Sequence, residues 1–527
     1  MRNVFIVLLS LSALTAAFHA QAPVYDLIIR NGQVIDGTGA PPRRADVAIA
    51  GGTIAAVGAL PDARAAAEID ASGLVVAPGF IDVHTHADSL DEQPEPEHFL
   101  RMGVTTVIAG NCGGSSLPLA GALAGIEAAR PALNFATLVG HNTVRRAVME
   151  TARRAATPGE LEQMRALVRQ AMLDGAVGFS TGLQYVPGTY APTSEIVALA
   201  TVAGGLGGVY ASHMRNEGTE LEKAVAEALH VGEQAQCPVQ ISHLKVDSPA
   251  NWGASAKALG LIDAARRKGM IVNADQYAYS AASSSLGIRF PSWVLEGGQE
   301  KINGRLDDAD TWARIKKEMR GLIRERGIEE YDFAVVAQYR PDPSRNGLSI
   351  EQIAMRERKR DDLDAQLEVM REMLRAGGAS MVYHFMGEDD IARIMRHPHV
   401  SFASDSGLNR LGEGVPHPRG YGNNARVLGL YVRDKHVIPL EEAIRKMTSL
   451  PAEHFGFAGR GVLAEGRAAD VVVFDAARVA DAATYEKPHQ HAVGFAHVVV
   501  NGVPVIQGGR LTGARPGQVL RGRGYTP

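Results

Sequence analysis

Strand-like and helix-like segments alternate along most of this chain, and this alternation restricts its fold more than any other feature. Amphipathic helical segments such as 158–175 and 217–235 separate short apolar runs. The strand candidates are the runs 104–110, 134–142, 175–183, 207–214, 238–245, 270–277, 380–385 and 400–405. Such alternation is typical of parallel α/β folds. In a barrel of this class, the functional residues lie at the carboxyl ends of the strands.

A further strand candidate precedes these runs and ends in two histidines. The segment PGFIDVHTHAD, residues 78–88, places His84 and His86 two positions apart. Residues i and i+2 of a strand point to the same side, so both imidazoles can face one metal ion. The alternative is a strand whose histidines merely lie near the surface. The preceding Pro-Gly-Phe-Ile-Asp favours the metal-binding interpretation.

Four more polar residues with metal-binding chemistry follow later strand candidates. Cys112 lies in a glycine-rich turn, His213 and His243 end two runs about 30 residues apart, and Asp405 ends a late run. A thiolate, imidazoles and a carboxylate together form a plausible zinc environment. Each residue alone could be an ordinary hydrogen-bonded polar group at a strand end. As a set with the two histidines, they predict a metal site.

The two ends of the chain carry short β segments of a different kind. Residues 23–77 and 456–527 contain hairpin-like patterns, including strand, Asn-Gly turn, strand in DLIIRNGQVIDGTG and an Asn-Gly turn in AHVVVNGVPVIQ. We expect these segments to pair into one small β-sandwich beside a barrel of residues 78–455. The stretch of about 283–381 is charged and less regular, which indicates an insertion that covers the site.

Composition and the first residues bear on location and partners. The 527 residues are 46% hydrophobic with a net charge of -4, which argues against a nucleic-acid partner. Residues 1–22 combine Arg2, an apolar run and the small-x-small ending Ala20-Gln21-Ala22, as in a secretory signal peptide. The alternative is a membrane anchor, for which the run is short. We expect an exported protein, without stable membrane insertion after cleavage near Ala22, that acts on a small molecule; a homo-oligomer is compatible with the sequence.

Several segments in order resemble the N-acyl-D-amino-acid deacylase (D-aminoacylase) family of the amidohydrolase superfamily. The segments are GNCG, LVGHNTVR, GAVGFSTGLQYVPG, YASHMRNEG, ISHLKV, DQYAY, ASD, HPRGYGNNARVLG and MTSLPAEHFGFAGRGVLAEGRAADVVVFD. The resemblance covers nearly the whole chain after residue 22. It implies an α/β fold with a (β/α)₈ TIM-like barrel and a β-sandwich built from both chain ends.

The same resemblance implies the roles of the metal-binding residues. Cys112, His213 and His243 would hold a tightly bound zinc ion, and His84, His86 and Asp405 would line a second, weaker position. Many related enzymes carry a carboxylated lysine after a strand-end turn, whereas the comparable turn here is GFSTG, without lysine. The Cys112 thiolate would supply that negative charge. Cys112 would then be unavailable for the alternative, a disulfide with Cys237, which we expect to be a buried free thiol.

Catalysis and substrate binding follow from these assignments. Asp405 would accept the proton of the attacking water and deliver it to the departing amine, the alternative being a pure metal ligand or turn residue. Lys245, two residues beyond His243, can share its side of the strand and pair with a substrate carboxylate. Further candidates for substrate binding are Tyr277, Tyr279, His141 and Arg289. His141 could equally cap a helix, Arg289 and Trp293 could be ordinary loop residues, and Arg419 is expected to orient its loop.

These observations predict a zinc-dependent hydrolase that cleaves N-acyl-D-amino acids into a carboxylate and a free D-amino acid. The preference for the D-enantiomer is implied by the resemblance alone. The first alternative is an amidase of the same fold that acts on N-acyl-L-amino acids or dipeptides. The second is a secreted binding protein without catalysis, which the complete set of metal-binding residues disfavours.

Overall fold

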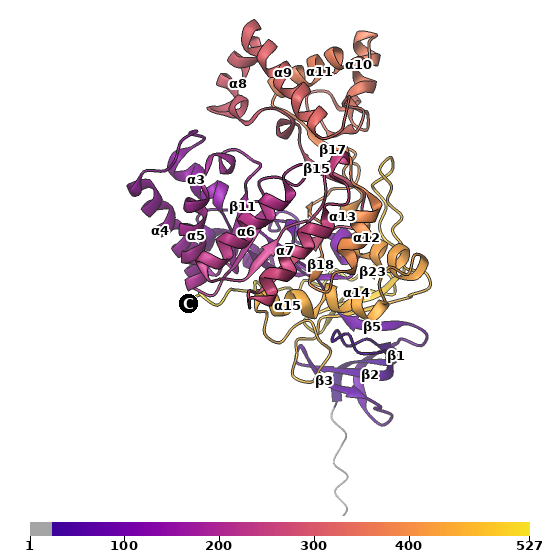
Figure 1. Ribbon diagram of the computed structural model, residues 1–527. Helices are drawn as coiled ribbons and strands as arrows, with labels where there is room; N and C mark the ends of the chain where they lie inside the picture. The colour runs from indigo at the N-terminus through magenta and orange to yellow at the C-terminus, as the bar shows by residue number, and fades with distance from the viewer. Residues whose placement is uncertain (1–23) are drawn as a thin grey trace, which may run out of the picture.

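The predicted (β/α)₈ barrel forms the centre of the computed structural model, which describes residues 24–527 (Figure 1). Within these residues, eight parallel strands form the barrel in two ladders. The first ladder contains β6 (Phe80–Asp82), β8 (Val104–Ala109) and β9 (Asn134–Thr137). The second contains β10 (Val139–Gly140), which continues β9, then β11 (Gly178–Gly182), β12 (Val209–His213), β13 (Val239–Ile241), β14 (Val272–Gln276) and β18 (Val400–Phe402).

The last strand of the barrel meets the first through a seam of hydrogen bonds. The Asp405 amide donates to the His84 carbonyl over 2.9 Å, and the Ser404 amide donates to the buried Asp82 carboxylate over 3.1 Å. Just beyond, β19 (Ser406–Gly407) pairs in parallel with β7 (Thr85–His86). The barrel therefore closes where two of its polar strand ends lie side by side.

Helices cover the outside of the barrel, as the amphipathic pattern predicts. The helices around it are α3 (His141–Met149), α4 (Pro158–Asp174), α5 (Thr193–Gly205), α6 (Leu221–Ala235), α7 (Ser255–Arg267), α12 (Glu388–Arg396) and α14 (Leu440–Met447). α4 shows the local reasons for their positions. Thr157 and Glu160 form a reciprocal capping box at its start, and Met164, Val168 and Met172 bury one face at intervals of four residues.

Strands from both ends of the described chain form one sheet at the amino-terminal side of the barrel (Figure 1). They are β1 (Val24–Val34), β2 (Arg43–Ala50), β3 (Thr53–Gly58), β4 (Arg64–Asp70), β5 (Val75–Pro78), β20 (Val471–Phe474), β21 (Phe495–Val500), β22 (Val503–Gln507) and β23 (Arg510–Leu511). β5 pairs with β20 and so joins the two halves. Asn501 and Gly502 both have positive φ between β21 and β22, as the predicted Asn-Gly turn requires.

The first Asn-Gly pair behaves differently from its prediction. β1 runs without a turn through Asn31 and Gly32, where its register against β2 shifts by a bulge. Gly32 packs so closely on Val76 that an added Cβ would lie 2.3 Å from its Cγ2. The positive φ of Asn31 therefore serves a bulge in a continuous strand, and the predicted hairpin at this point is wrong.

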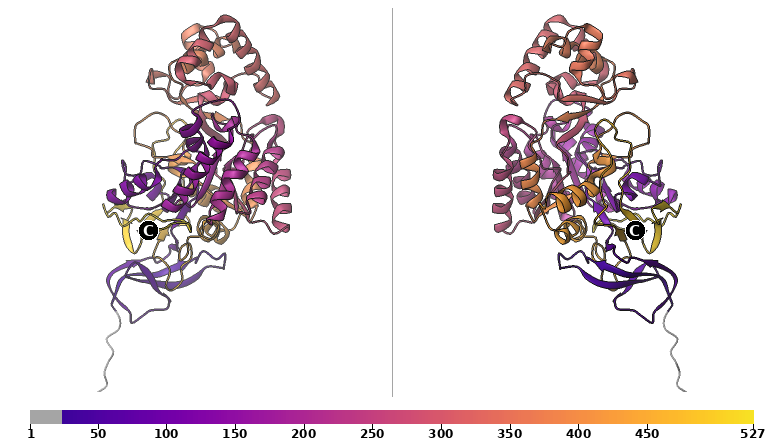
Figure 2. Two further views of the ribbon diagram at one scale, coloured as in Figure 1. Left: turned by 90° about the vertical axis from the view of Figure 1, so that its left-hand side faces the viewer. Right: turned by 90° about the vertical axis from the view of Figure 1, so that its right-hand side faces the viewer.

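A large insertion lies between β14 and β18, at the carboxyl ends of the barrel strands (Figures 1 and 2). It contains the helices α8 (Gly298–Asp307), α9 (Ala309–Glu325), α10 (Ile350–Arg358) and α11 (Leu363–Arg375). Its three strands, β15 (Ala281–Ser285), β16 (Ala334–Gln338) and β17 (Ser380–His384), form a separate antiparallel sheet. The run 380–385, which the sequence placed among the barrel strands, thus belongs to the insertion instead.

Two further predictions concern the chain termini and membranes. The predicted signal peptide at 1–22 lies outside the described residues. Within the described part of the chain, no helix combines the length and apolar character needed to cross a bilayer.

Candidate active site

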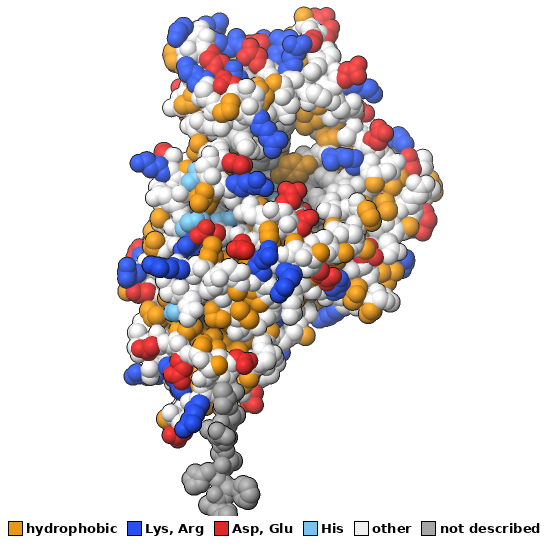
Figure 3. Space-filling model, turned by 180° about the vertical axis from the view of Figure 1, so that it is seen from behind, with side chains coloured by type: hydrophobic (Ala, Val, Ile, Leu, Met, Phe, Trp, Pro, Cys, Tyr) orange, Lys and Arg blue, Asp and Glu red, His pale blue; other side chains and the backbone are white. Residues whose placement is uncertain are grey.

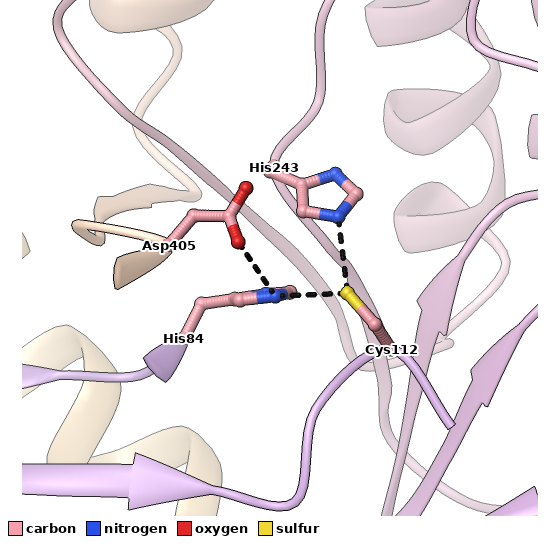
Figure 4. Close-up of side chains that lie close together, drawn as sticks. All are labelled: His84, Cys112, His243 and Asp405. Carbon is pink, nitrogen blue, oxygen red and sulfur yellow. Dashed lines mark hydrogen bonds and ion pairs between the residues drawn. The ribbon is translucent and has the colours of Figure 1, made fainter. Parts of the chain in front are cut away.

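Side chains that could bind a metal ion converge at the carboxyl ends of the barrel strands (Figure 4). The Cys112 sulfur lies 3.2 Å from His84 Nε2 and 3.5 Å from His243 Nε2. Asp405 Oδ1 lies 3.6 Å from the same nitrogen of His84. These four residues follow β6, β8, β13 and β18, so the barrel brings together side chains more than 300 positions apart in the sequence.

The two remaining predicted ligands lie beside this group. His213 Nδ1 is 3.5 Å from the Cys112 sulfur and 2.9 Å from His243 Nε2. His86 Nε2 is 3.2 Å from Asp405 Oδ1, and its side chain is 40% exposed. The structure therefore gathers all six predicted metal-binding residues, with His86 at the more open edge.

Three residues of this group have a backbone conformation that side chains other than glycine rarely adopt. The φ angles are +53° at Cys112, +34° at His243 and +50° at Asp405. Such conformations cost on the order of 1–3 kcal/mol each and cluster at functional sites. Each of these side chains turns inward directly after its strand. The unfavourable backbone conformation that this requires indicates a functional role for the three positions.

The donor set fits a zinc ion. The ligand atoms fall into two groups that share His243, and within each group they lie within 4.8 Å of one another. The groups are His84, Cys112, His243 and Asp405, and His213, Glu217 and His243. Sulfur, imidazole nitrogen and carboxylate oxygen are the ligands that zinc prefers. His213 Nδ1 and His243 Nε2 lie only 2.9 Å apart. A metal ion between them would let both nitrogens direct their lone pairs at the same place without repulsion. Burial lowers the pKa of His213 to about 3, so this imidazole is held in the neutral form that binds metals.

Cys112 would also need a bound cation to become a thiolate. Burial raises the pKa of Cys112 well above its ordinary value, and the Asp405 and Glu217 carboxylates raise it further. A bound metal ion opposes this effect, because coordination deprotonates a thiol. Both Cys112 and Cys237 are free and Cys237 is buried, so the disulfide alternative does not occur in the structure.

Two buried carboxylates that the sequence analysis missed orient the histidines. Glu217 Oε1 lies 2.8 Å from His243 Nδ1, which leaves Nε2 of that ring directed at the metal-binding group. Asp275, at the end of β14, accepts the His243 amide over 2.8 Å and lies 3.6 Å from His84 Nδ1. Carboxylates on the outer nitrogen of a metal-binding histidine fix its tautomer and orientation. Asp275 lies near the end of β14, in NADQY, and Glu217 lies four residues after β12, in RNEG; their closeness to polar strand ends is the signal that could have identified them.

Arg419 has a more direct role than the predicted loop orientation. Its guanidinium forms a 2.9 Å ion pair with Asp405 Oδ2 and lies over the Tyr277 ring. Although burial favours the protonated acid, Arg419 and the nearby imidazoles hold the pKa of Asp405 well below its ordinary value. Asp405 is therefore kept as a carboxylate.

A cavity of about 430 Å³ opens above this group, between the barrel and the insertion (Figure 3). Lys245, Tyr277 and Arg289 line it, as their predicted substrate contacts require. Lys245 Nζ lies 2.6 Å from Glu217 Oε1 and 2.8 Å from His243 Nδ1. A second cavity of about 260 Å³ adjoins the first, and the two share Asp405 and Arg419 in their linings.

Two predicted substrate-binding residues lie outside the lining of these cavities. Tyr279 donates to Asp481 over 3.2 Å and packs against His417. His141 is fully buried, and its Nε2 lies 2.8 Å from Glu195, which also binds Arg145. The predicted substrate contacts of Tyr279 and His141 are therefore not supported, because both side chains are occupied in packing. Trp293 likewise donates to Glu318 within the insertion.

Comparisons with known proteins agree with this geometry. A sequence profile described as the amidohydrolase family matches residues 67–506. A D-aminoacylase of Alcaligenes xylosoxydans xylosoxydans is 39% identical over 94% of this chain and 97% of its own length. An N-acyl-D-glutamate deacylase of the same organism is 40% identical over 94% and 96%.

A solved structure shows the same likeness in three dimensions. It is the N-acyl-D-glutamate deacylase from Bordetella bronchiseptica, complexed with zinc and a phosphonate inhibitor that mimics the tetrahedral intermediate. It superposes with a TM-score of 0.82 at 38% identity and covers 95% of this chain and 100% of its own. From the matching profile, relatives and structure, this chain belongs to the amidohydrolase family, in its group of N-acyl-D-amino-acid deacylases, the D-aminoacylases.

Proposed function

We propose that this protein hydrolyses the amide bond of N-acyl-D-amino acids with the help of zinc. The observation that carries the proposal is the convergence of Cys112, His213, His243 and Asp405 beneath a cavity. The lining of this cavity includes the cationic side chains of Lys245, Arg289 and Arg419. The relatives named as D-aminoacylase and N-acyl-D-glutamate deacylase, together with the zinc complex, support the substrate class and the metal.

Cys112, His213 and His243 would hold the tightly bound ion. Their ligand atoms lie within 3.5 Å of one another, and the sulfur contributes a negative charge. His84, His86 and Asp405 would line a second and weaker position, since Asp405 is shared with Arg419 and His86 is partly exposed. When bound, zinc polarises the amide carbonyl and lowers the pKa of a water molecule.

The proton transfers are assigned to Asp405. Held as a carboxylate by Arg419, it accepts a proton from the attacking water, and the water oxygen bonds to the carbonyl carbon. Asp405 then delivers this proton to the nitrogen as the carbon–nitrogen bond breaks. The products are a carboxylic acid and an amine, and proton transfer between them gives a carboxylate and an ammonium, so atoms and charges balance. His243 would keep its orientation throughout, because Glu217 lies 2.8 Å from its outer nitrogen.

The substrate α-carboxylate would bind beside the reacting group. Lys245 and Tyr277 line the cavity next to His243, and Arg419 stands between Asp405 and the Tyr277 ring. Lys245 is already paired with Glu217 at 2.6 Å, so its position is fixed before substrate binds. Preorganised charge of this kind lowers the cost of orienting the substrate.

Activity assays with paired enantiomers test this function. The zinc-loaded protein should hydrolyse N-acetyl-D-amino acids and leave the L-enantiomers largely intact. Asp405→Asn should lower kcat by about 1000-fold or more, in line with the loss of a general acid–base and its charge, while Cys112→Ala should lose the tight zinc. An L-preference, or full activity after Asp405→Asn, would contradict the proposal.

We also propose that the protein is exported. The proposal rests on Arg2, the following apolar run and the sequence Ala20-Gln21-Ala22. Expression in a bacterial host followed by fractionation should give a mature chain outside the cytoplasm that begins near Pro23. A cytoplasmic protein that retains residues 1–22 would contradict it.

A further inference from the structure

The charges around the larger cavity do not balance. Three carboxylates line it, and each already holds a cation: Glu217 binds Lys245, Asp247 binds Arg326, and Asp405 binds Arg419. Arg289 also lines the cavity and forms no ion pair with any carboxylate of the described residues. The lining therefore carries one guanidinium whose charge nothing in the described chain neutralises.

The surroundings of Arg289 are costly for an unpaired charge. The residue is only 8% exposed, and its buried Nε has no hydrogen-bond partner among the described residues. The guanidinium lies over Tyr383 at 4.1 Å from the ring centre, with Phe385 at 5.1 Å and Phe333 at 5.9 Å. These rings hold it in a fixed plane but do not supply the anion that a buried guanidinium requires. A ligand anion would remove this penalty.

The position of Arg289 assigns it to a different part of the substrate from Lys245 and Arg419. Those two cations contact His243 and Asp405 and so stand at the reacting amide and the adjacent α-carboxylate. Arg289 instead follows β15, within the insertion. Its aromatic cage consists of Tyr383 in β17, Phe385 just after β17 and Phe333 just before β16. Ser283, Ser284 and Ser380 continue the same polar wall. In the proposed function, this wall would face the group that projects from the α-carbon of the substrate.

We propose that Arg289 binds a second carboxylate, at the end of the substrate side chain, so that the preferred substrates are N-acyl derivatives of acidic D-amino acids. This inference rests on the proposed function, because it concerns the same cavity. A planar guanidinium matches a carboxylate with two parallel hydrogen bonds, and a site built for such a pair discriminates strongly against a neutral amide of the same shape.

The test compares two acidic substrates with a neutral one, of which the glutamate and glutamine derivatives differ in this charge alone. N-acetyl-D-glutamate, N-acetyl-D-aspartate and N-acetyl-D-glutamine are assayed with the zinc-loaded protein. We expect kcat/KM for one of the two acids to exceed that for the glutamine derivative by about 100-fold. Arg289→Met should remove most of this ratio, chiefly through KM for the acid, and Arg289→Lys should retain part of it.

A matched control is Arg314→Met, because Arg314 stacks on Trp293 at 4.4 Å within the same insertion and is paired with Glu318 on the surface. It should leave the substrate ratio unchanged. A wild-type preference for the neutral substrate would overturn the inference, as would an equal loss on both substrates in Arg289→Met. If no N-acetyl-D-amino acid of any kind is hydrolysed, the proposed function itself fails, which is a separate outcome.

Discussion

At the scale of single residues, two buried carboxylates lie behind the histidines of the candidate zinc site. Glu217 is 4% exposed and contacts both His243 and Lys245. Burial alone would raise the pKa of Glu217, but Lys245 and the two histidines beside it hold that pKa well below its ordinary value. Glu217 therefore stays ionised and fixes the His243 tautomer.

We predict that Glu217→Gln lowers zinc affinity by about 10- to 100-fold, as substitutions behind metal ligands typically do. Competition with a chromophoric chelator measures the effect. Glu220→Gln is the control, because Glu220 pairs with Lys223 on the surface three residues away. Unaltered zinc affinity in Glu217→Gln would show that the His243 tautomer is set by other groups.

A second residue-scale prediction concerns Lys446, which is fully buried on α14. Its ammonium donates to the Met395 carbonyl, and burial lowers its pKa from 10.5 to about 7. The unfolded chain thus binds this proton more readily, and stability falls as the pH decreases from about 10.5 to 7. Lys446→Met should raise the free energy of unfolding by a few kcal/mol at neutral pH, because each tenfold difference in proton affinity between the two states corresponds to about 1.4 kcal/mol.

The gain from Lys446→Met should be greatest below pH 7 and shrink toward pH 10.5, which chemical denaturation at several pH values measures. Lys435→Met is the control, since Lys435 is partly exposed and paired with Glu388. A gain that does not vary with pH would show that packing, rather than the ammonium, causes it.

The metal-binding residues that the structure gathers as predicted share one property. His84, His86, Cys112, His213, His243 and Asp405 all stand at the ends of recognisable strands. Glu217, Asp275 and the ion pair of Arg419 with Asp405 escaped prediction, because acidic and basic residues in loops are common and their partners depend on tertiary packing. Tyr279 and His141 also stand near strand ends, but the structure turns them into packing contacts.

At the scale of elements, α3 and α5 are joined through a buried ionic group. Glu195 on α5 binds both His141 and Arg145 on α3, and Arg145 is fully buried. We predict that Glu195→Gln destabilises the protein by about 3 kcal/mol, because it leaves a buried guanidinium without its anion, and that KM is unchanged. Thermal unfolding and steady-state assays measure the two effects.

Glu227→Gln is the matched control for this helix contact. Glu227 also pairs with an arginine, Arg215, but in a partly exposed setting, so its loss should cost less. A change in KM for Glu195→Gln would restore the substrate-binding role that the sequence suggested for His141.

Element types were easier to predict than element partners. The alternation of strands and helices indicated the barrel because its period is local. The run 380–385 has the same apolar character as a barrel strand, yet it pairs with β15 and β16, since pairing depends on where the chain leads after β14. Likewise, Asn31-Gly32 has the composition of a turn but lies in a strand that must continue to meet β5.

At the scale of the whole molecule, the proposed catalytic groups and the proposed contact with the substrate side chain come from different parts of the chain. The barrel supplies the metal-binding residues, and the insertion supplies Arg289 and its aromatic cage. The insertion can therefore vary in sequence without disturbing the strand ends. If Arg289 binds the substrate side chain, such a division would let one barrel chemistry serve different side chains.

The join between β6 and β18 lies directly beside the candidate active site. His84, His86 and Asp405 flank this join. The backbone amide of Asp405 donates a hydrogen bond across it to the His84 carbonyl, and His86 pairs with Gly407. An ion that draws these groups together stabilises the closed ring, because it binds only the folded arrangement. Removing the ion with a chelator should therefore speed hydrogen–deuterium exchange at residues 82–86 and 403–407 before it does so on the opposite side at β11 and β12. Loss of the metal ion would then open the barrel locally, between β6 and β18.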